Sequence, residues 1–273
     1  MKKFIFICFL CLLWVSLYAE RDMADYMFLS HSNQYMMPES KSPQEDAFST
    51  PREIIIRYRK IIIRAANAYH IEPELLADVV FVETYGGGIS GWYELKNRLS
   101  VTKQFLFGNA TIGITQVTPH NIKDFQDIIN YNYDVFWQLG QGARQLASIK
   151  YTLYPNTPHL TEERMMNVLR FYNQGTKQKI YSYSKEENPV GHYALASYKK
   201  NLRIRKRLRL EKKPPYFSCE IAQYDTKKKA TVIYMFGVPV AEYRIGGSKN
   251  KANSYAFTAY RNRERIRRWL KGE

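Results

Sequence analysis

Apolar residues recur at helical spacing through much of this chain, and no strand pattern competes with them before residue 215. Thr50-Pro51-Arg52-Glu53 is a capping box with proline in the first helical turn. The helix predicted from there carries apolar residues on one face, namely Ile54, Ile55, Tyr58, Ile61, Ile62 and Ala65. Helical patterns recur at 137–153 and 161–174, bounded by Pro155, Pro158 and Gly175. The sequence therefore predicts a mainly α protein, with an all-helical domain over residues 49–213.

A glutamate stands at the end of a further predicted helix, which opens at Pro73 and ends just before Gly86-Gly87-Gly88. The residues three, four and seven positions before Glu83 are apolar, so its carboxylate falls on the buried stripe. Apolar surroundings and the negative end of the helix dipole are expected to raise the pKa of this carboxyl. A carboxyl that stays protonated near neutrality suits a general acid. The alternative is a side chain that bends out to solvent at a frayed helix end.

Three sequence blocks follow one another in order, namely Glu83-Thr84, Gly113-Ile114-Thr115-Gln116-Val117 and Leu169-Arg170-Phe171-Tyr172-Asn173-Gln174-Gly175. Together they resemble the Glu-Ser, Gly-Leu-Met-Gln and Ala-Tyr-Asn-x-Gly signatures of the soluble lytic transglycosylase family, whose fold is similar to that of goose-type lysozyme. Residues 65–76 look like the approach helix and turn of that family, and residues 139–146 look like its helix with an early glycine. The resemblance covers roughly residues 50–205.

The chain departs from the family pattern at several points. Thr84 stands for the usual serine, Thr115 for the usual methionine, and Phe171 where alanine is common. The stretch from Glu83 to Gln116 is longer than usual, with extra residues between Gly86 and Phe107. Aromatic residues in and beside this insertion are expected either to stack on sugar rings or to pack the insertion against the rest of the domain. They are Tyr85, Trp92, Tyr93, Phe105 and Phe107.

The resemblance implies cleavage of the β-1,4 bond between N-acetylmuramic acid and N-acetylglucosamine in peptidoglycan. Glu83 would first donate a proton and then, as carboxylate, help the 6-hydroxyl of the muramic acid attack its own anomeric carbon, giving a 1,6-anhydro sugar. Gln116 would line the cleft, or merely cap a turn, and Tyr172 would set the geometry of the carboxyl, with Asn173 ordering the cleft. Thr84 and Thr115 complete the expected substrate-binding residues. No cofactor is implied.

Two rival interpretations stay open. A hydrolase of the goose-type lysozyme kind would let water attack and would want a second carboxylate, for which Asp78, Glu94 and Asp124 are available. The second interpretation is a non-catalytic envelope protein that binds the cell wall through a degenerate lysozyme-like domain. The five histidines show no metal-ligand spacing, so no metal site is expected.

The chain begins like an exported protein. Residues 1–19 read as a signal peptide, with a charged start, an apolar run from Phe4 to Leu17 and a plausible cleavage point after Ala19. Residues 20–48 show no period and read as a flexible leader. After cleavage only Cys219 remains, so no internal disulfide is expected. The periplasm or cell envelope is the predicted location.

The last quarter of the chain has a different character. Pro214-Pro215 suggests a boundary, followed by predicted strands at 216–224 and 231–245 and a basic helix near 260–271, a small α+β appendage over 214–273. From Lys199 onward 21 Lys and Arg face 6 Asp and Glu, whereas residues 1–198 carry 20 against 19. Such charge suits an anionic wall or membrane surface, or a solvated face with no dedicated partner. An envelope protein is a further possible partner, and the signal peptide argues against nucleic acid.

Overall fold

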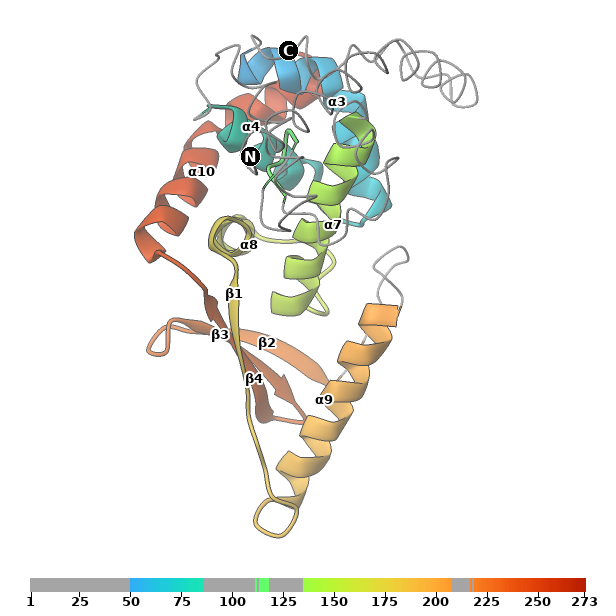
Figure 1. Ribbon diagram of the computed structural model, residues 1–273, viewed down its shortest axis with the longest axis vertical. Coiled ribbons are helices and arrows are strands. Elements are labelled where there is room, and N and C mark those ends of the chain that lie inside the picture. Colours follow the sequence, from blue (N-terminus) through green and yellow to red (C-terminus); the bar gives the residue numbers. More distant parts are fainter. Residues whose placement is uncertain (1–49, 86–110, 112, 118–134, 208–216, 218) are drawn as a thin grey trace, which may run out of the picture. The chain divides into compact units, whose positions relative to one another are not determined.

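The computed structural model of the chain describes residues 50–85, 111, 113–117, 135–207, 217 and 219–273. The predicted signal peptide, the leader and the insertion between Gly86 and Phe107 lie outside these residues. Residues from Pro43 to Glu273 cluster as one compact unit. The described part of this unit is mainly helical with a small antiparallel sheet, as predicted (Figure 1).

Helices α3 (Pro51–Ala68) and α4 (Pro73–Tyr85) form the first part of the core. The predicted capping box of α3 is confirmed, because the Thr50 hydroxyl accepts from the Glu53 backbone N–H and the Glu53 carboxylate accepts from that of Thr50, at 3.3 and 2.7 Å. Helix α4 is buried along most of its length against α3 and α7. Helices α7 (Val135–Leu153) and α8 (Glu162–Gln174) match the predicted helices at 137–153 and 161–174.

A four-stranded sheet has the order β1-β4-β3-β2, with every neighbouring pair antiparallel. Its strands are β1 (Thr176–Ile180), β2 (Glu220–Asp225), β3 (Ala230–Met235) and β4 (Val238–Ile245). The expectation that no strand precedes residue 215 was wrong. Strand β1 is an edge strand whose residues are all exposed, so it carries no apolar alternation by which the sequence could reveal it.

The sheet is bonded to the helices around it. Helix α9 (Pro189–Arg207) packs against β3 and β4, where the hydroxyls of Tyr198 and Tyr243 share a hydrogen bond of 2.6 Å. Arg205 on α9 forms a buried ion pair with Glu220 on β2 and donates to the backbone carbonyl of Tyr151 on α7 at 2.8 Å. The ion pair of Arg205 with Glu220 thus joins residues on either side of the boundary suggested at Pro214-Pro215, which itself lies outside the described residues.

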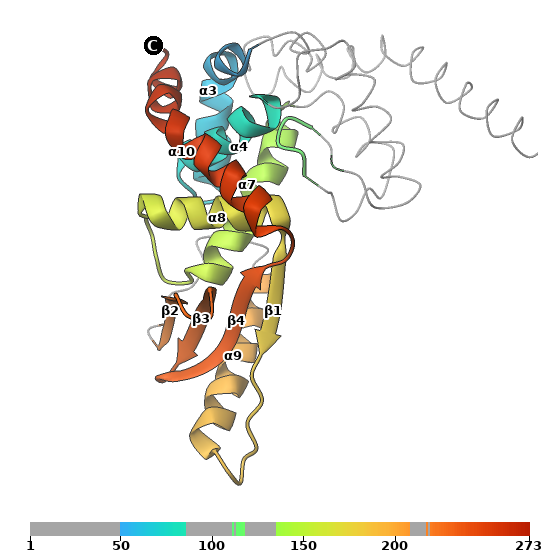
Figure 2. The ribbon, with the colours of Figure 1, turned by 90° about the vertical axis from the view of Figure 1, so that its left-hand side faces the viewer.

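The long terminal helix α10 (Lys249–Lys271) packs across α3, α4 and α8 (Figure 2). It contains the predicted helix near 260–271 but begins earlier, where the Ser248 hydroxyl caps its first turn. Near its end the ring of Trp269 contacts that of Phe81 on α4, with centroids 6.0 Å apart. The chain thus returns to the helices with which its described part begins. None of the helices described combines the length and apolar character needed to cross a bilayer.

Candidate active site

Glu83 lies in the last turn of α4, half-buried, after a run of seven buried residues from Leu75 to Phe81. This places its carboxylate between the core and the helix end. The next residue, Thr84, donates its hydroxyl to the backbone carbonyl of Val80 at 2.6 Å. That bond satisfies a helix carbonyl, so the only hydroxyl proton of Thr84 is used within α4.

The hydroxyl of Tyr255 on α10 donates a hydrogen bond of 2.9 Å to Oε1 of Glu83. Tyr255 is buried. Burial and the nearby Glu83 carboxylate raise the pKa of the Tyr255 phenol well above its ordinary value. The phenol therefore stays a proton donor at every physiological pH. Sequence reasoning missed this residue, because it lies far beyond the three recognised blocks.

Gln116 occupies a tight turn in which both Gly113 and Gln116 have positive φ, at 76° and 48°. The backbone N–H of Gln116 donates to the Gly113 carbonyl at 3.0 Å, and its side-chain Nε2 donates to the same oxygen at 2.8 Å. The Thr111 hydroxyl donates to Oε1 of Gln116 at 3.1 Å. The two roles expected for Gln116 were lining the cleft and capping a turn. These bonds correspond to capping the turn, and the side chain is half-buried.

Thr115 is fully buried and fixes this turn against α7. Its hydroxyl donates to the backbone carbonyl of Gln138 at 3.2 Å, and Oε1 of Gln138 accepts from the Ile114 N–H at 3.0 Å. A Cβ atom at Gly142 would stand 2.7 Å from the Thr115 side chain, so the close approach requires glycine there. Thr115 thus holds the turn against α7 from within the core.

Tyr172 on α8 is bonded to this turn. Its buried hydroxyl donates to the backbone carbonyl of Thr115 at 2.6 Å. Burial, and then the charge of Glu83, raise the pKa of the Tyr172 phenol far above its usual value. The expected contact of Tyr172 with the carboxyl takes this indirect form, because its one proton goes to Thr115. The structure thus brings together one residue from each of the three blocks.

Asn173 has a different setting. Its Oδ1 accepts from Nε2 of Gln174 at 2.6 Å, and Oε1 of Gln174 accepts from the Ser248 N–H at 2.8 Å. These bonds brace the turn that leads into α10. The structure therefore connects Asn173 with the start of α10 and gives it no hydrogen bond to Glu83.

Asp78, one of the carboxylates considered for a hydrolase, is fully buried on α4 and forms an ion pair with Arg263 of α10. Burial, partly offset by Arg263, raises the pKa of Asp78 to about 6. It has no access to the water that a hydrolase must activate. Glu94 and Asp124 lie outside the described residues, as do Trp92, Tyr93, Phe105 and Phe107.

The described residues define a mainly α-helical protein with a small antiparallel sheet and a half-buried, hydrogen-bonded carboxyl at a helix end. Within the described ranges, no three His, Cys, Asp or Glu side chains are grouped so as to hold a metal ion. No protein-family model matches the chain, and neither the curated proteins nor the solved structures include a match for it.

Proposed function

We propose that this protein is an exported lytic transglycosylase that cleaves the β-1,4 bond between N-acetylmuramic acid and N-acetylglucosamine in peptidoglycan. One observation carries the proposal. Glu83, the Thr115-Gln116 turn and Tyr172 stand far apart in the sequence, yet Tyr172 bonds the turn at 2.6 Å and lies within electrostatic reach of Glu83. This bond between the second and third blocks, together with the electrostatic influence of Glu83 on Tyr172, supports the proposal.

Glu83 has both roles in this mechanism. As an acid it protonates the glycosidic oxygen while the bond from that oxygen to the anomeric carbon breaks. As a carboxylate it then accepts the proton of the muramic acid 6-hydroxyl, whose oxygen forms the new bond to the anomeric carbon. No water is consumed, and the carboxyl regains its proton for the next cycle. A half-buried carboxyl with a permanent hydrogen-bond donor suits this exchange because it is held in place and still accessible.

The burial of Asp78 argues against it as the second carboxylate of a hydrolase. Among the described residues it was the candidate second carboxylate on the helix of Glu83, and its pairing with Arg263 gives it a structural role. A non-catalytic protein has no need of a carboxyl that is held at the rim of a core by a buried phenol.

The test is mass spectrometry of purified peptidoglycan after incubation with the full chain. A transglycosylase releases 1,6-anhydro-muropeptides, a hydrolase releases muropeptides with reducing ends, and a binding protein releases nothing. Glu83→Gln keeps the side-chain volume but has no proton to give, so release of anhydro products should stop. Glu186→Gln, at an exposed glutamate before α9, is the matched control and should cleave normally. Reducing-end products, or cleavage by Glu83→Gln above about a tenth of wild type, would refute the proposal.

Attachment to an anionic wall or membrane surface is the second part of the proposal. It depends on the exposed basic residues of α10, which are Lys249, Lys251, Arg261, Arg265, Arg268 and Lys271. Exposed charges act over a screening length of ~10 Å at 0.1 M salt, so binding should weaken as salt rises. Co-sedimentation with sacculi should drop for the triple change of Arg261, Arg265 and Arg268 to Gln. Changing the exposed Lys60, Lys177 and Lys185 to Gln removes the same charge elsewhere and should have a smaller effect. Equal, salt-independent pelleting of both variants would point to a protein partner.

A further inference from the structure

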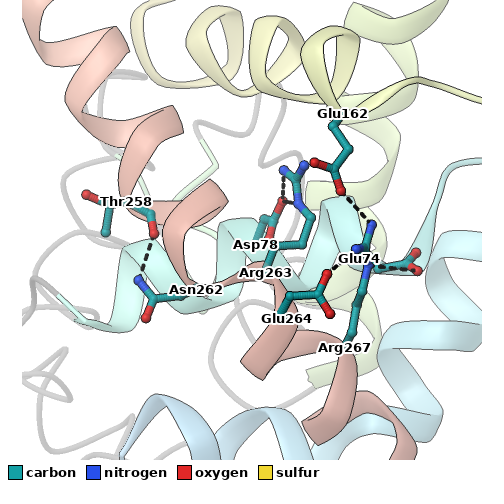
Figure 3. A network of polar contacts seen from close by, with 8 residues as sticks. All are labelled: Glu74, Asp78, Glu162, Thr258, Asn262, Arg263, Glu264 and Arg267. Carbon is teal, nitrogen blue, oxygen red and sulfur yellow. Dashed lines mark hydrogen bonds and ion pairs between the residues drawn. The ribbon is translucent and has the colours of Figure 1, made fainter.

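Helices α4 and α10 run antiparallel and are joined by polar contacts at three successive levels. Glu74 contacts Arg267 at 4.0 Å, Asp78 pairs with Arg263, and Glu83 accepts from Tyr255 at 2.9 Å. Figure 3 shows the first two levels, with Arg263 pointing from α10 at Asp78. We refer to these three contacts as the α4–α10 ladder. From one contact of the ladder to the next, residue numbers increase along α4 and decrease along α10, by roughly one or two helical turns.

The middle contact of the ladder fixes how the two helices meet. Both side chains are essentially inaccessible, with exposed fractions of 0% for Asp78 and 1% for Arg263. Nε of Arg263 donates to Oδ2 of Asp78 at 3.0 Å, and Nη2 donates to the same oxygen. Shifting α10 by one residue would separate these two buried charges, which is costly. The pair therefore determines the register in which Tyr255 reaches Glu83.

Building on the proposed function, we infer that α10 is part of the active site and that Tyr255 is the positioning residue for Glu83. The hydroxyl of Tyr255 holds one carboxyl oxygen, Oε1, in a fixed orientation. A phenol donates more favourably to the carbonyl-type oxygen of a carboxylic acid than to its hydroxyl oxygen. The acid form of Glu83 therefore carries its proton on Oε2, which becomes the atom that gives and later takes the proton.

Tyr255 also acts on the base form of Glu83. After proton transfer the same phenol donates to a carboxylate, and such charge-assisted bonds are the stronger kind. Among the described residues, Tyr172 from α8 and Asp78 from α4 itself also act electrostatically on Tyr255. Tyr172 stays neutral because burial raises the pKa of its phenol, and the phenol of Tyr255 donates directly to the carboxyl.

The first test compares Tyr255→Phe with wild type in the full chain, using anhydro-muropeptide release. Loss of a hydrogen bond to a charged group should lower kcat about ten- to hundredfold while KM changes little, since substrate contacts remain. Tyr260→Phe on the exposed side of the same helix is the matched control and should keep wild-type kcat. Thermal melting of both variants shows whether α10 stays docked. A Tyr255→Phe enzyme with wild-type kcat would overturn the inference even if Glu83→Gln is inactive.

A second test needs no cleavage, so it separates this inference from the proposed function. The carboxyl carbon of Glu83 is followed by NMR titration in wild type and in Tyr255→Phe, and Glu83→Gln identifies its signal. Removing a donor to the carboxylate should raise the pKa of Glu83 by about one unit, because the ionised form loses its partner. Tyr260→Phe should leave that pKa unchanged. An unchanged pKa in Tyr255→Phe refutes the positioning role, whereas a raised pKa in a protein that cleaves no glycan refutes only the transglycosylase proposal.

Discussion

Replacing Arg263 with methionine should destabilise the protein in a pH-dependent way. The change removes the cation that faces the fully buried Asp78 and retains most of the side-chain volume. Breaking one side of a buried pair costs about 3–5 kcal/mol, a large share of the ~5–15 kcal/mol that holds a typical domain together. The remaining partner decides the size of the loss, because Asp78 can lose its charge by protonation.

The direction of the pH effect follows from the pKa of Asp78. Burial already raises it from 3.8 to about 6 with Arg263 present, and removing Arg263 must raise it further. A folded state with a raised carboxyl pKa binds more protons than the unfolded state, so the free energy of unfolding falls as pH rises through that interval. Arg263→Met should therefore cost less at about pH 5 than at about pH 8.

Asp78→Asn should be the more damaging change at both pH values. It leaves Arg263 buried and charged, and an arginine cannot shed its proton in a protein. Combining Asp78→Asn with Arg263→Met removes both charges and should recover part of the loss, with a coupling energy of about 1–3 kcal/mol. Arg267→Met, on the same helix with an exposed fraction of 32%, is the control and should cost below about 1 kcal/mol.

Urea unfolding of the full chain, followed by circular dichroism at the two pH values, measures all four variants. Three results would contradict the reasoning. These are a loss in Arg263→Met that does not vary with pH, an Asp78→Asn variant more stable than Arg263→Met, or a double variant whose loss is the sum of the two single losses. Any of these results would mean that the Asp78–Arg263 pair does not stabilise the packing of α10 against α4.

Other changes have equally definite outcomes. Gly142→Ala should destabilise by about 1–3 kcal/mol in urea unfolding, because its Cβ would meet Thr115 at 2.7 Å, whereas Gly140→Ala, with its nearest atom at 4.0 Å, should be neutral or stabilising. Deleting residues 249–273 should leave an insoluble or molten chain by near-UV circular dichroism, since it exposes the core faces of three helices; a cooperative melt in the shortened chain would contradict this. Lys229→Asn should raise stability by about 0.5 kcal/mol in the same unfolding assay, because the exposed Lys229 has a φ of 50° that asparagine tolerates better.

Local sequence signals predicted the elements well. The capping box at Thr50 and the proline at the start of α4 each depend on neighbours in the chain, and each was found where predicted. The position of Glu83 at the edge of a buried stripe followed from spacing on a single helix. Its pKa and its role in catalysis stay predictions.

The sequence could not show which residues of different helices and strands contact one another. Tyr255 lies on a stripe of buried residues at helical spacing, Ala252, Tyr255, Ala256, Ala259, Arg263, Ile266 and Leu270. An arginine interrupts the apolar stripe, so the pattern looks like a solvated helix until Asp78 is known to face it. The stripe was the available signal for the docking of α10, and with it for Tyr255.

The basic character of the last quarter has two separate physical origins. Arg205 and Arg263 are buried and each is bonded to a carboxylate of another element, Glu220 and Asp78, so their charges serve the fold. The exposed arginines of α10, such as Arg261 and Arg265, face solvent and are the ones available to an anionic surface. A count along the sequence adds both kinds together, so it does not show which of the charges can reach an anionic surface. Neutralising the buried kind tests how the chain folds, and only neutralising the exposed kind tests what it binds.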